Sequence, residues 1–493
     1  MAREGEAEGP HGEHPTGFAG LMRNRNYALL WSGQLVSEMG NRFHWLAVSL
    51  WIYSLTQSAA SVSLAISAMF VGGLAVSLWA GALIDRLNRK WVLISADLCR
   101  AILASLIPTL IDINLWLVYI DLALVSVATA FFRPAIFALV PRIVARKDLL
   151  SANSFFSAMD TGTEIIGPAI AGILALRYGY SLLLYVDSLT YVFSAVLILL
   201  MVGTFAPRKP SADTPIPGLW RGVVEGLSYI RRDHLQWALF VLIFPAYLVG
   251  SGLNALQTPL AKGEIGISDA QFGTFNSVWG AGFLVASLLL GWYGSIVSKG
   301  GLVLGGFLLQ FSFTALMGMS TNVSTLYATA FLVGFSNTMS YVGLSTVLME
   351  HTPSEIMGRV VSTRQVALHL VRIVSPLVFG ASAELLGIRQ AILLMTLTGA
   401  VGTLVVSGFL HPFDTGGRER HIADGGPWRR IAPVDMTYDV PQQVRLNVAA
   451  LVALAICWII VAVRDFSGAV WLLVSLVSLA YLGFLGRRRK WLP

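Results

Sequence analysis

Residues 61–111 consist of SVSLAISAMFVGGLAVSLWAGALI (61–84), DRLNRK (85–90) and WVLISADLCRAILASLIPTLI (91–111). Each outer segment is long and apolar enough to cross a bilayer, which takes roughly 20 apolar residues in a helix. The short segment between them is charged, and charged side chains are costly in hydrocarbon. This pattern predicts two transmembrane helices joined by a tight polar loop.

The composition extends this conclusion to the whole chain of 493 residues. Hydrophobic residues make up 55% and charged residues 12%, whereas a soluble domain carries about 25% charged residues. The mean hydropathy is +0.69. We therefore expect an all-α polytopic membrane protein. Cys99 and Cys457 both fall in apolar segments, so neither a disulfide nor a metal site is expected.

Apolar runs bounded by polar residues or by Gly and Pro predict about fourteen spanning segments. The expected segments are 28–55, 61–84, 91–111, 114–136, 155–178, 181–203, 236–258, 271–296, 301–320, 324–349, 361–386, 389–410, 445–463 and 468–486. Six helices, a polar linker, six more helices and a C-terminal pair is an arrangement typical of transporters built from two related halves.

These segments divide the chain into regions. We expect a cytoplasmic tail (1–27), a first six-helix half (28–206), a cytoplasmic linker (207–234), a second six-helix half (235–411), a polar linker (412–444) and a helical hairpin with a basic tail (445–493). Within the first linker, GVVEGLSYIRRDHL is typical of an amphipathic helix on a membrane surface. The polar first 26 residues lack a signal-peptide pattern.

The basic residues predict the orientation. Most of the 34 Lys and Arg lie in alternate loops, which would be cytoplasmic if both termini are cytoplasmic. The basic residues expected outside are Arg177, Lys262, Arg389 and Arg464. We therefore predict a multi-pass protein of the bacterial inner membrane. The formal charge of +7 follows from this topology, and no nucleic-acid partner is expected.

The loop GALIDRLNRK (81–90) resembles the signature loop of the major facilitator superfamily between its helices 2 and 3. The resemblance implies a conformational latch, in which charged groups pair at the cytoplasmic rim and release during transport. Its residues would be Gly81, Asp85, Arg86, Arg89 and Lys90. The corresponding loop of the second half, GWYGSIVSKGG from Gly291, lacks the Asp-Arg pair, so the latch would be asymmetric.

The segment TGTEIIGPAIAG (161–172) is similar to an element associated with antiporters of the same superfamily. Gly167, Pro168 and Gly172 match it, whereas Thr163 and Ala171 replace two glycines. Small residues at this spacing also allow ordinary close packing of helices, and Pro bends a helix. The segment therefore supports export, with helix packing as the alternative interpretation.

The wider resemblance covers most of 20–410. It includes WSGQLVSEMGNRF, ISADLCRA, FRPAIFALVPRIVARKDLLSANS, EGLSYIRRD and MGRVVSTRQ in family order. These segments resemble the branch of the superfamily that contains macrolide-efflux and enterobactin-exporter proteins. The resemblance implies a major facilitator fold and a secondary transporter, but it does not identify the substrate. The C-terminal helix pair lies outside it.

Ionisable residues within spans are candidates for coupling or substrate contact. Asp160 and Glu164 are four residues apart, so they share one helix face and could carry protons or instead pair between helices. Glu38 and Arg42 have the same spacing and could neutralise each other. Arg372 has no nearby acid in the sequence, and we expect a carboxylate of the first or fifth helix to pair with it.

Other in-span residues are interpreted as structural. Asp97 and Arg100 are expected to pair within one helix or at the rim, and His44 and His369 are expected to be packing residues. No phosphate-binding loop, HExxH or nucleophile–base arrangement is found, so we expect no enzyme activity, no cofactor and no metal.

The sequence thus favours a proton-coupled exporter, an antiporter, that moves bulky organic or amphiphilic small molecules by alternating access. Two alternatives stay open. The protein could translocate lipid or lysolipid between leaflets, or it could be a non-transporting assembly scaffold that binds a protein partner through its two C-terminal helices. Membrane lipid is an expected partner in each case.

Overall fold

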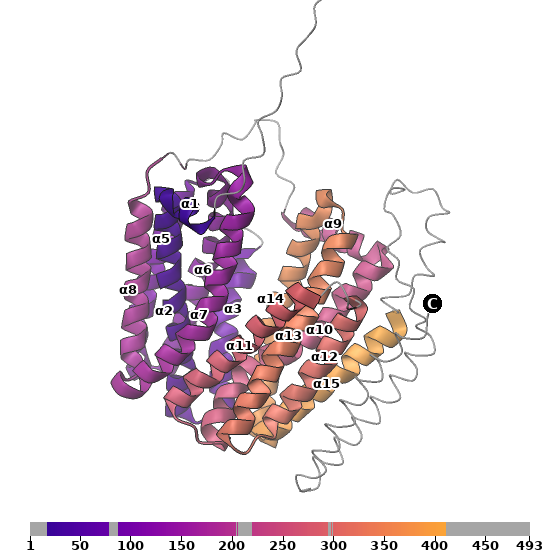
Figure 1. Ribbon diagram of the computed structural model, residues 1–493. Coiled ribbons are helices and arrows are strands. Elements are labelled where there is room, and N and C mark those ends of the chain that lie inside the picture. Colours follow the sequence, from indigo (N-terminus) through magenta and orange to yellow (C-terminus); the bar gives the residue numbers. More distant parts are fainter. Residues whose placement is uncertain are drawn as a thin grey trace, which may run out of the picture. The chain divides into compact units, whose positions relative to one another are not determined.

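The computed structural model describes residues 17–77, 87–203, 205, 219–293, 297 and 299–410 (Figure 1). Within these ranges every regular element is a helix. The elements are α1 (Phe18–Arg23), α2 (Arg25–Thr56), α3 (Ala59–Ser77), α5 (Arg89–Ile113), α6 (Leu115–Ile143), η1 (Arg146–Asp148), α7 (Leu149–Tyr178), α8 (Tyr180–Leu199), α9 (Leu219–Arg232), α10 (His234–Thr258), η2 (Pro259–Glu264), α11 (Asp269–Tyr293), α12 (Lys299–Gly318), α13 (Val323–His351), α14 (Ser354–Leu386) and α15 (Ile388–Leu410).

Ten of the described helices are long and apolar enough to span a membrane. Two further predicted spans are not among these ten. Helix α2 has 32 residues but carries Gln34, Glu38, Asn41 and Arg42, which lower its hydropathy, and the predicted span 61–84 extends beyond the described part of α3, Ala59–Ser77. The two C-terminal segments predicted near 445–463 and 468–486 lie outside the described residues.

Local capping explains where several helices begin and end. The Asn88 side chain accepts a hydrogen bond from the Lys90 backbone N–H and begins α5, and Asn114 does the same for α6 through Trp116. Such side-chain acceptors satisfy N–H groups that have no partner inside the helix. Gly179 ends α7 with a positive φ of 81°, a conformation that suits glycine. These capping residues therefore mark where the helices end and the loops begin.

We call α2, α3 and α5–α8 the first helix group, and α10–α14 with α15 up to Ala400 the second helix group. The chain divides at Ala400 into two compact units, and everything described below belongs to the first of them. The connections α2–α3, α7–α8, α10–α11 and α14–α15 lie at one end of the helices, here called the hairpin end. The other end, where α2 starts and α8 finishes, is called the linker end (Figure 1).

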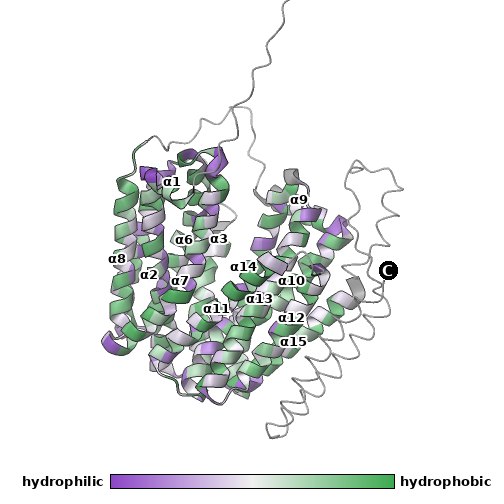
Figure 2. Cartoon of the chain, viewed as in Figure 1, coloured by the Kyte–Doolittle hydropathy of each residue, from purple (hydrophilic) through white to green (hydrophobic). Residues whose placement is uncertain are grey.

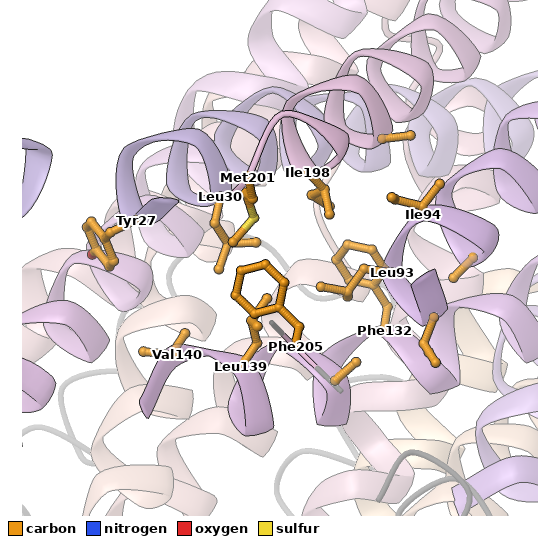
Figure 3. Packing of buried hydrophobic residues seen from close by; sticks show 14 of the residues in the cluster. Tyr27, Leu30, Leu93, Ile94, Phe132, Leu139, Val140, Ile198, Met201 and Phe205 are labelled. Atoms are coloured by element: carbon orange, nitrogen blue, oxygen red, sulfur yellow. The ribbon is translucent and has the colours of Figure 1, made fainter. Parts of the chain in front are cut away.

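The first helix group has an apolar core near the linker end (Figure 3). Phe205, which follows α8, packs among Leu30 of α2, Leu93 of α5 and Leu139 of α6. Burial of apolar area of this kind stabilises the group by roughly 25 cal/mol per Å². The helices are mostly hydrophobic along their length, and hydrophilic residues gather toward their ends (Figure 2). This distribution fits helices whose outer faces contact lipid.

Helix α9 corresponds to the predicted amphipathic helix, but it packs on protein. Its Ile230 joins an apolar cluster with Phe240 of α10, Leu348 of α13 and Val360 of α14. Its Glu225 pairs with Arg359 of α14 at 2.7 Å. The predicted helix is therefore present and packs partly on the second helix group, and its placement on the cytoplasmic membrane surface stays a prediction.

Candidate functional site

The two helix groups are joined by hydrogen bonds at the hairpin end. Glu384 of α14 accepts from the Ser58 hydroxyl at 2.7 Å and from the Ala60 backbone N–H at 3.0 Å. Tyr180 of α8 donates to Asp269 of α11 at 3.1 Å. Hydrogen bonds to a charged acceptor are stronger than neutral ones, so these contacts hold the hairpin ends of the two groups together.

A seam between α3 and α14 continues from the hairpin end toward mid-membrane. Ser67 donates to the backbone oxygen of Ile373 at 2.9 Å. Further along, the imidazole of His369 lies over Gly73, where an added Cβ would come within 2.7 Å of the ring. His369 is thus packed between the groups, and its Nδ1 lies 2.7 Å from the backbone oxygen of Gln365.

The antiporter-like segment lies where α7 contacts two neighbours. A Cβ on Gly167 would come within 2.8 Å of the Arg42 side chain on α2. A Cβ on Gly172 would come within 2.5 Å of the Asp269 backbone oxygen and 2.9 Å of Gly273 on α11. Pro168 is buried within the same helix. These close approaches support the packing interpretation, and the link of the segment to antiport stays a prediction.

Four predicted site residues come together in what we call the α2–α7 charge cluster, which contains Glu38, Arg42, Asp160, Glu164 and Arg133 of α6. Arg42 lies 3.9 Å from Glu164, and Arg133 lies 3.4 Å from Asp160. Glu38 lies within electrostatic reach of Asp160 but has no ion-pair partner among the described residues. The alternative Glu38–Arg42 pair is therefore wrong for this structure, because the Arg42 guanidinium points to α7 instead.

A second cluster, here called the buried cluster, lies behind the α2–α7 charge cluster. The sequence analysis did not predict two of its members, Asp121 and Asp187. Asp187 of α8 is fully buried, and its Oδ2 lies 2.9 Å from Nδ1 of His44 on α2. Asp121 of α6 is also buried and lies within electrostatic reach of His44. Asp97 pairs with Arg100 within α5, as predicted, although both side chains are buried and do not lie at a rim.

The other members of the buried cluster are two aromatic rings and one amide side chain. The Arg100 guanidinium lies 4.1 Å from the centre of the Phe132 ring and 4.4 Å from that of Tyr191. Tyr191 donates to the side-chain oxygen of Asn41 at 2.5 Å. Such contacts offset the cost of burying a guanidinium. The only available sequence signal for Asp121 and Asp187 was a lone carboxylate in each of LWLVYIDLAL and LLLYVDSLTYV.

Arg372 lies apart from both clusters, in what we call the α14 basic cluster with Arg364 and His369. Its guanidinium lies 5.4 Å from the ring centres of both Phe70 on α3 and Tyr247 on α10. Within the described ranges it has no carboxylate at ion-pair distance. The expected pairing with an acid of the first or fifth span is therefore not found, because aromatic rings occupy the positions around it.

Only part of the predicted latch can be compared with the structure. Gly81, Asp85 and Arg86 lie outside the described residues. Arg89 is buried at the start of α5. Lys90 donates to the backbone oxygens of Leu199 and Met201, each at 2.8 Å. A cation suits the carbonyl end of a helix, so Lys90 here caps α8, and its role in a latch stays a prediction.

An apolar cavity of about 360 Å³ lies between α1, α2 and α7. Its walls on α7 include Ala158, Gly162 and Ile166, which are two residues away from Asp160 and Glu164. Two residues correspond to roughly 200° around a helix, so the cavity and the charges lie on opposite faces of α7. In the described part of the chain, no group of His, Cys, Asp and Glu is arranged to hold a metal ion.

Comparisons with known proteins agree with this fold. The chain is 24% identical over 390 residues to macrolide efflux protein A of Streptococcus pyogenes, covering 76% of this chain and 92% of the relative. It is 25% identical over 304 residues to the putative bacilysin exporter BacE of Bacillus subtilis, covering 59% and 72%. Both identities are low, so these relatives indicate family but not substrate.

Two solved structures share the arrangement of helices. A point mutant of the nucleoside transporter NupG matches with a TM-score of 0.67 and 12% identity, covering 79% of this chain and all of that chain (100%). A bacterial homologue of the lysosomal transporter Spinster, inward-facing and unoccupied, matches with a TM-score of 0.63 and 14% identity, covering 83% and 99%. At such identity the likeness supports the fold alone.

The sequence profile described as Major Facilitator Superfamily matches residues 30–260 and 239–486. These two ranges together cover most of the chain, so the predicted resemblance is confirmed. The efflux-named relatives and the apolar helices agree with it. The chain belongs to the Major Facilitator Superfamily and is a multi-pass membrane transporter of that superfamily.

Proposed function

We propose that this transporter is a proton-coupled exporter of bulky organic or amphiphilic compounds that works by alternating access. The observation that carries the proposal is Glu38. It is a carboxyl group within α2, which contains the predicted span 28–55, and it has no ion-pair partner among the described residues. An unpaired ionisable group in a span is costly, and it persists where function requires it.

The position of Glu38 suits proton transfer. It lies within electrostatic reach of Asp160 in the α2–α7 charge cluster and of Asp187 in the buried cluster. Neighbouring carboxyl groups within spans are candidates for proton carriers. Glu38, Asp160 and Glu164 are therefore proposed as the coupling residues. Arg42 would offset part of their negative charge through its contact with Glu164.

Alternating access requires that the groups separate at one end while they join at the other. The hydrogen bonds of Glu384 and Asp269 supply a reversible closure at the hairpin end. The seams α3–α14 and α7–α11 supply surfaces on which one group can rock against the other. The predicted six-helix halves, divided at the linker 207–234, would be the moving bodies.

We further propose that the hairpin end faces outward and that both termini are cytoplasmic in a bacterial inner membrane. Arg177 ends α7, Lys262 lies in η2 and Arg389 begins α15, all at the hairpin end. The remaining loops hold most of the basic residues, as the positive-inside rule requires. Export is supported by the names of two relatives, an efflux protein and a putative exporter.

The test is proton movement in proteoliposomes that contain the full-length protein and an entrapped pH-sensitive dye. A panel of macrolides, siderophores, dyes and lysolipids is added in turn. We expect a substrate-dependent pH change that falls by about tenfold or more in Glu38→Gln, because glutamine cannot take up and release the proton that Glu38 is proposed to carry.

A matched control is Glu350→Gln. Glu350 is also a carboxylate of a spanning helix, but it pairs with Lys299 at 2.6 Å near the linker end. Its replacement should leave the pH change intact. An equal loss in both variants, or no pH change with any compound in folded protein, would overturn the coupling proposal.

A second candidate function is translocation of lipid or lysolipid, and the apolar cavity between α1, α2 and α7 favours it. In that case Gly162→Leu, which fills the cavity, should slow transfer of a fluorescent lysolipid while Glu38→Gln does not. The scaffold alternative concerns the C-terminal helix pair, which lies outside the described residues; stable co-purification of a larger complex would support it.

A further inference from the structure

The α14 basic cluster has no role in the proton pathway proposed above. It contains Arg364, His369 and Arg372, all on one spanning helix. His369 lies against Gly73 and Arg372 against Phe70, so the cluster faces α3 of the first helix group. It therefore lies at the seam between the two groups.

The arginines of this cluster differ from other basic residues of the second helix group. Arg359 pairs with Glu225 at 2.7 Å, and Arg389 pairs with Glu264 at 2.9 Å. Among the residues that the structure describes, neither Arg364 nor Arg372 has such a carboxylate. A guanidinium within a span is stabilised by an anion, and here none of the described residues supplies one at ion-pair distance.

Aromatic side chains lie near the two guanidinium groups. Arg372 lies 5.4 Å from the ring centre of Tyr247. Arg364 lies within electrostatic reach of the hydroxyl groups of Tyr247 and Tyr341, and Tyr341 is 56% exposed. Aromatic rings beside a guanidinium help to hold it in place without neutralising its charge. A site of this kind suits a planar or tetrahedral anion attached to an apolar body.

We propose that Arg364 and Arg372 bind the anionic group of the transported compound, a carboxylate, sulfonate or phosphate, with its apolar part against Phe70 and Tyr341. The inference rests on the proposed function and narrows its substrate class to organic anions. The two guanidinium groups belong to one helix and flank Tyr247, which would let them hold one anion from two sides. The proton carriers belong to other helices, so proton and substrate use separate groups.

The test is binding of two dyes to the purified full-length protein in detergent, measured by fluorescence anisotropy. Fluorescein is an anion at mildly alkaline pH, and tetramethylrhodamine methyl ester is a cation with the same xanthene core. We expect the wild-type protein to bind fluorescein about tenfold more tightly or better, because a bidentate arginine contact contributes at least that much.

Arg372→Gln and Arg364→Gln should each remove most of this preference and leave binding of the cationic dye unchanged. Arg372→Lys should retain part of it, because the charge stays but the fork-shaped donor is lost. The matched control is Arg359→Gln. Arg359 lies on the same helix but already pairs with Glu225, so this variant should keep the preference for fluorescein over the cationic dye. Thermal unfolding of each variant verifies that it is folded.

Competition identifies the source of the anion. Displacement of fluorescein by phenyl phosphate would indicate a free organic anion, and displacement only by lysophosphatidic acid would indicate a lipid headgroup. The proposal is overturned if folded wild-type protein does not bind fluorescein, if it binds both dyes equally, or if Arg359→Gln acts like Arg372→Gln. Binding in detergent needs no proton gradient, so this result is independent of the test of proton coupling.

Discussion

The buried cluster of the first helix group and the α14 basic cluster of the second arrange in-membrane charge in opposite ways. In the first group, Asp97, Arg100 and Asp187 are almost completely buried and have partners within the group. In the second group, Arg364 and Arg372 are only partly buried and lack carboxylate partners among the described residues. Buried and paired charges stabilise one arrangement of helices, whereas unpaired charges at a seam remain available for a ligand. The comparison therefore separates structural charge from charge kept for function.

The largest expected effect tests the structural side of this comparison. Arg100→Met leaves the Asp97 carboxylate buried without its partner, which should lower the free energy of unfolding by about 3–5 kcal/mol. Reversible unfolding in mixed micelles measures the change. The double variant Asp97→Leu with Arg100→Met should recover most of the loss, because no buried charge remains; a double variant as unstable as the single one would contradict this interpretation.

An intermediate effect is expected at the His44–Asp187 contact. Asp187→Asn replaces a charge-assisted hydrogen bond by a neutral one and should cost about 1–2 kcal/mol. A double-mutant cycle with His44→Gln isolates this interaction from other consequences of each change. A coupling energy near zero would mean that the two side chains are neighbours without stabilising each other, and the buried cluster would then be weaker than proposed.

The smallest effect on stability is expected for the second group. Arg372→Gln removes two cation–π contacts with Phe70 and Tyr247, worth about 1 kcal/mol at a partly exposed site. The same unfolding measurement should show a loss well below that of Arg100→Met, although dye binding changes strongly. A loss as large as that of Arg100→Met would show that Arg372 is structural, and the contrast between the groups would fail.

Predictions of the fold from sequence were accurate where the signal was local. The segment 236–258 is α10, His234–Thr258, and 91–111 is α5, Arg89–Ile113. The length of an apolar run follows from bilayer thickness, and the N-cap residues Asn88 and Asp233 begin α5 and α10 at fixed positions. Helix α14 begins at Ser354, earlier than the predicted 361, because polar residues at its start are helical without being apolar.

Predictions of contacts were less complete, for a physical reason that single residues illustrate. The Asp97–Arg100 pair was predictable because three residues bring two side chains to one helix face. Arg42 and Glu38 are four residues apart and also share one helix face, yet Arg42 pairs with Glu164 of another helix. Sequence spacing limits which partners are possible within one helix, but it does not identify the neighbouring helix that competes for them.

The sequence by itself determined the class of protein, the approximate positions of the described helices and the family, because bilayer thickness, capping and the signature segments are local constraints. The tertiary structure alone decided which charges meet. It brought together His44 and Asp187, which are 143 residues apart, and surrounded Arg372 with Phe70 and Tyr247. Helical periodicity fixes the face on which a side chain lies, whereas helix packing decides which partner that face meets.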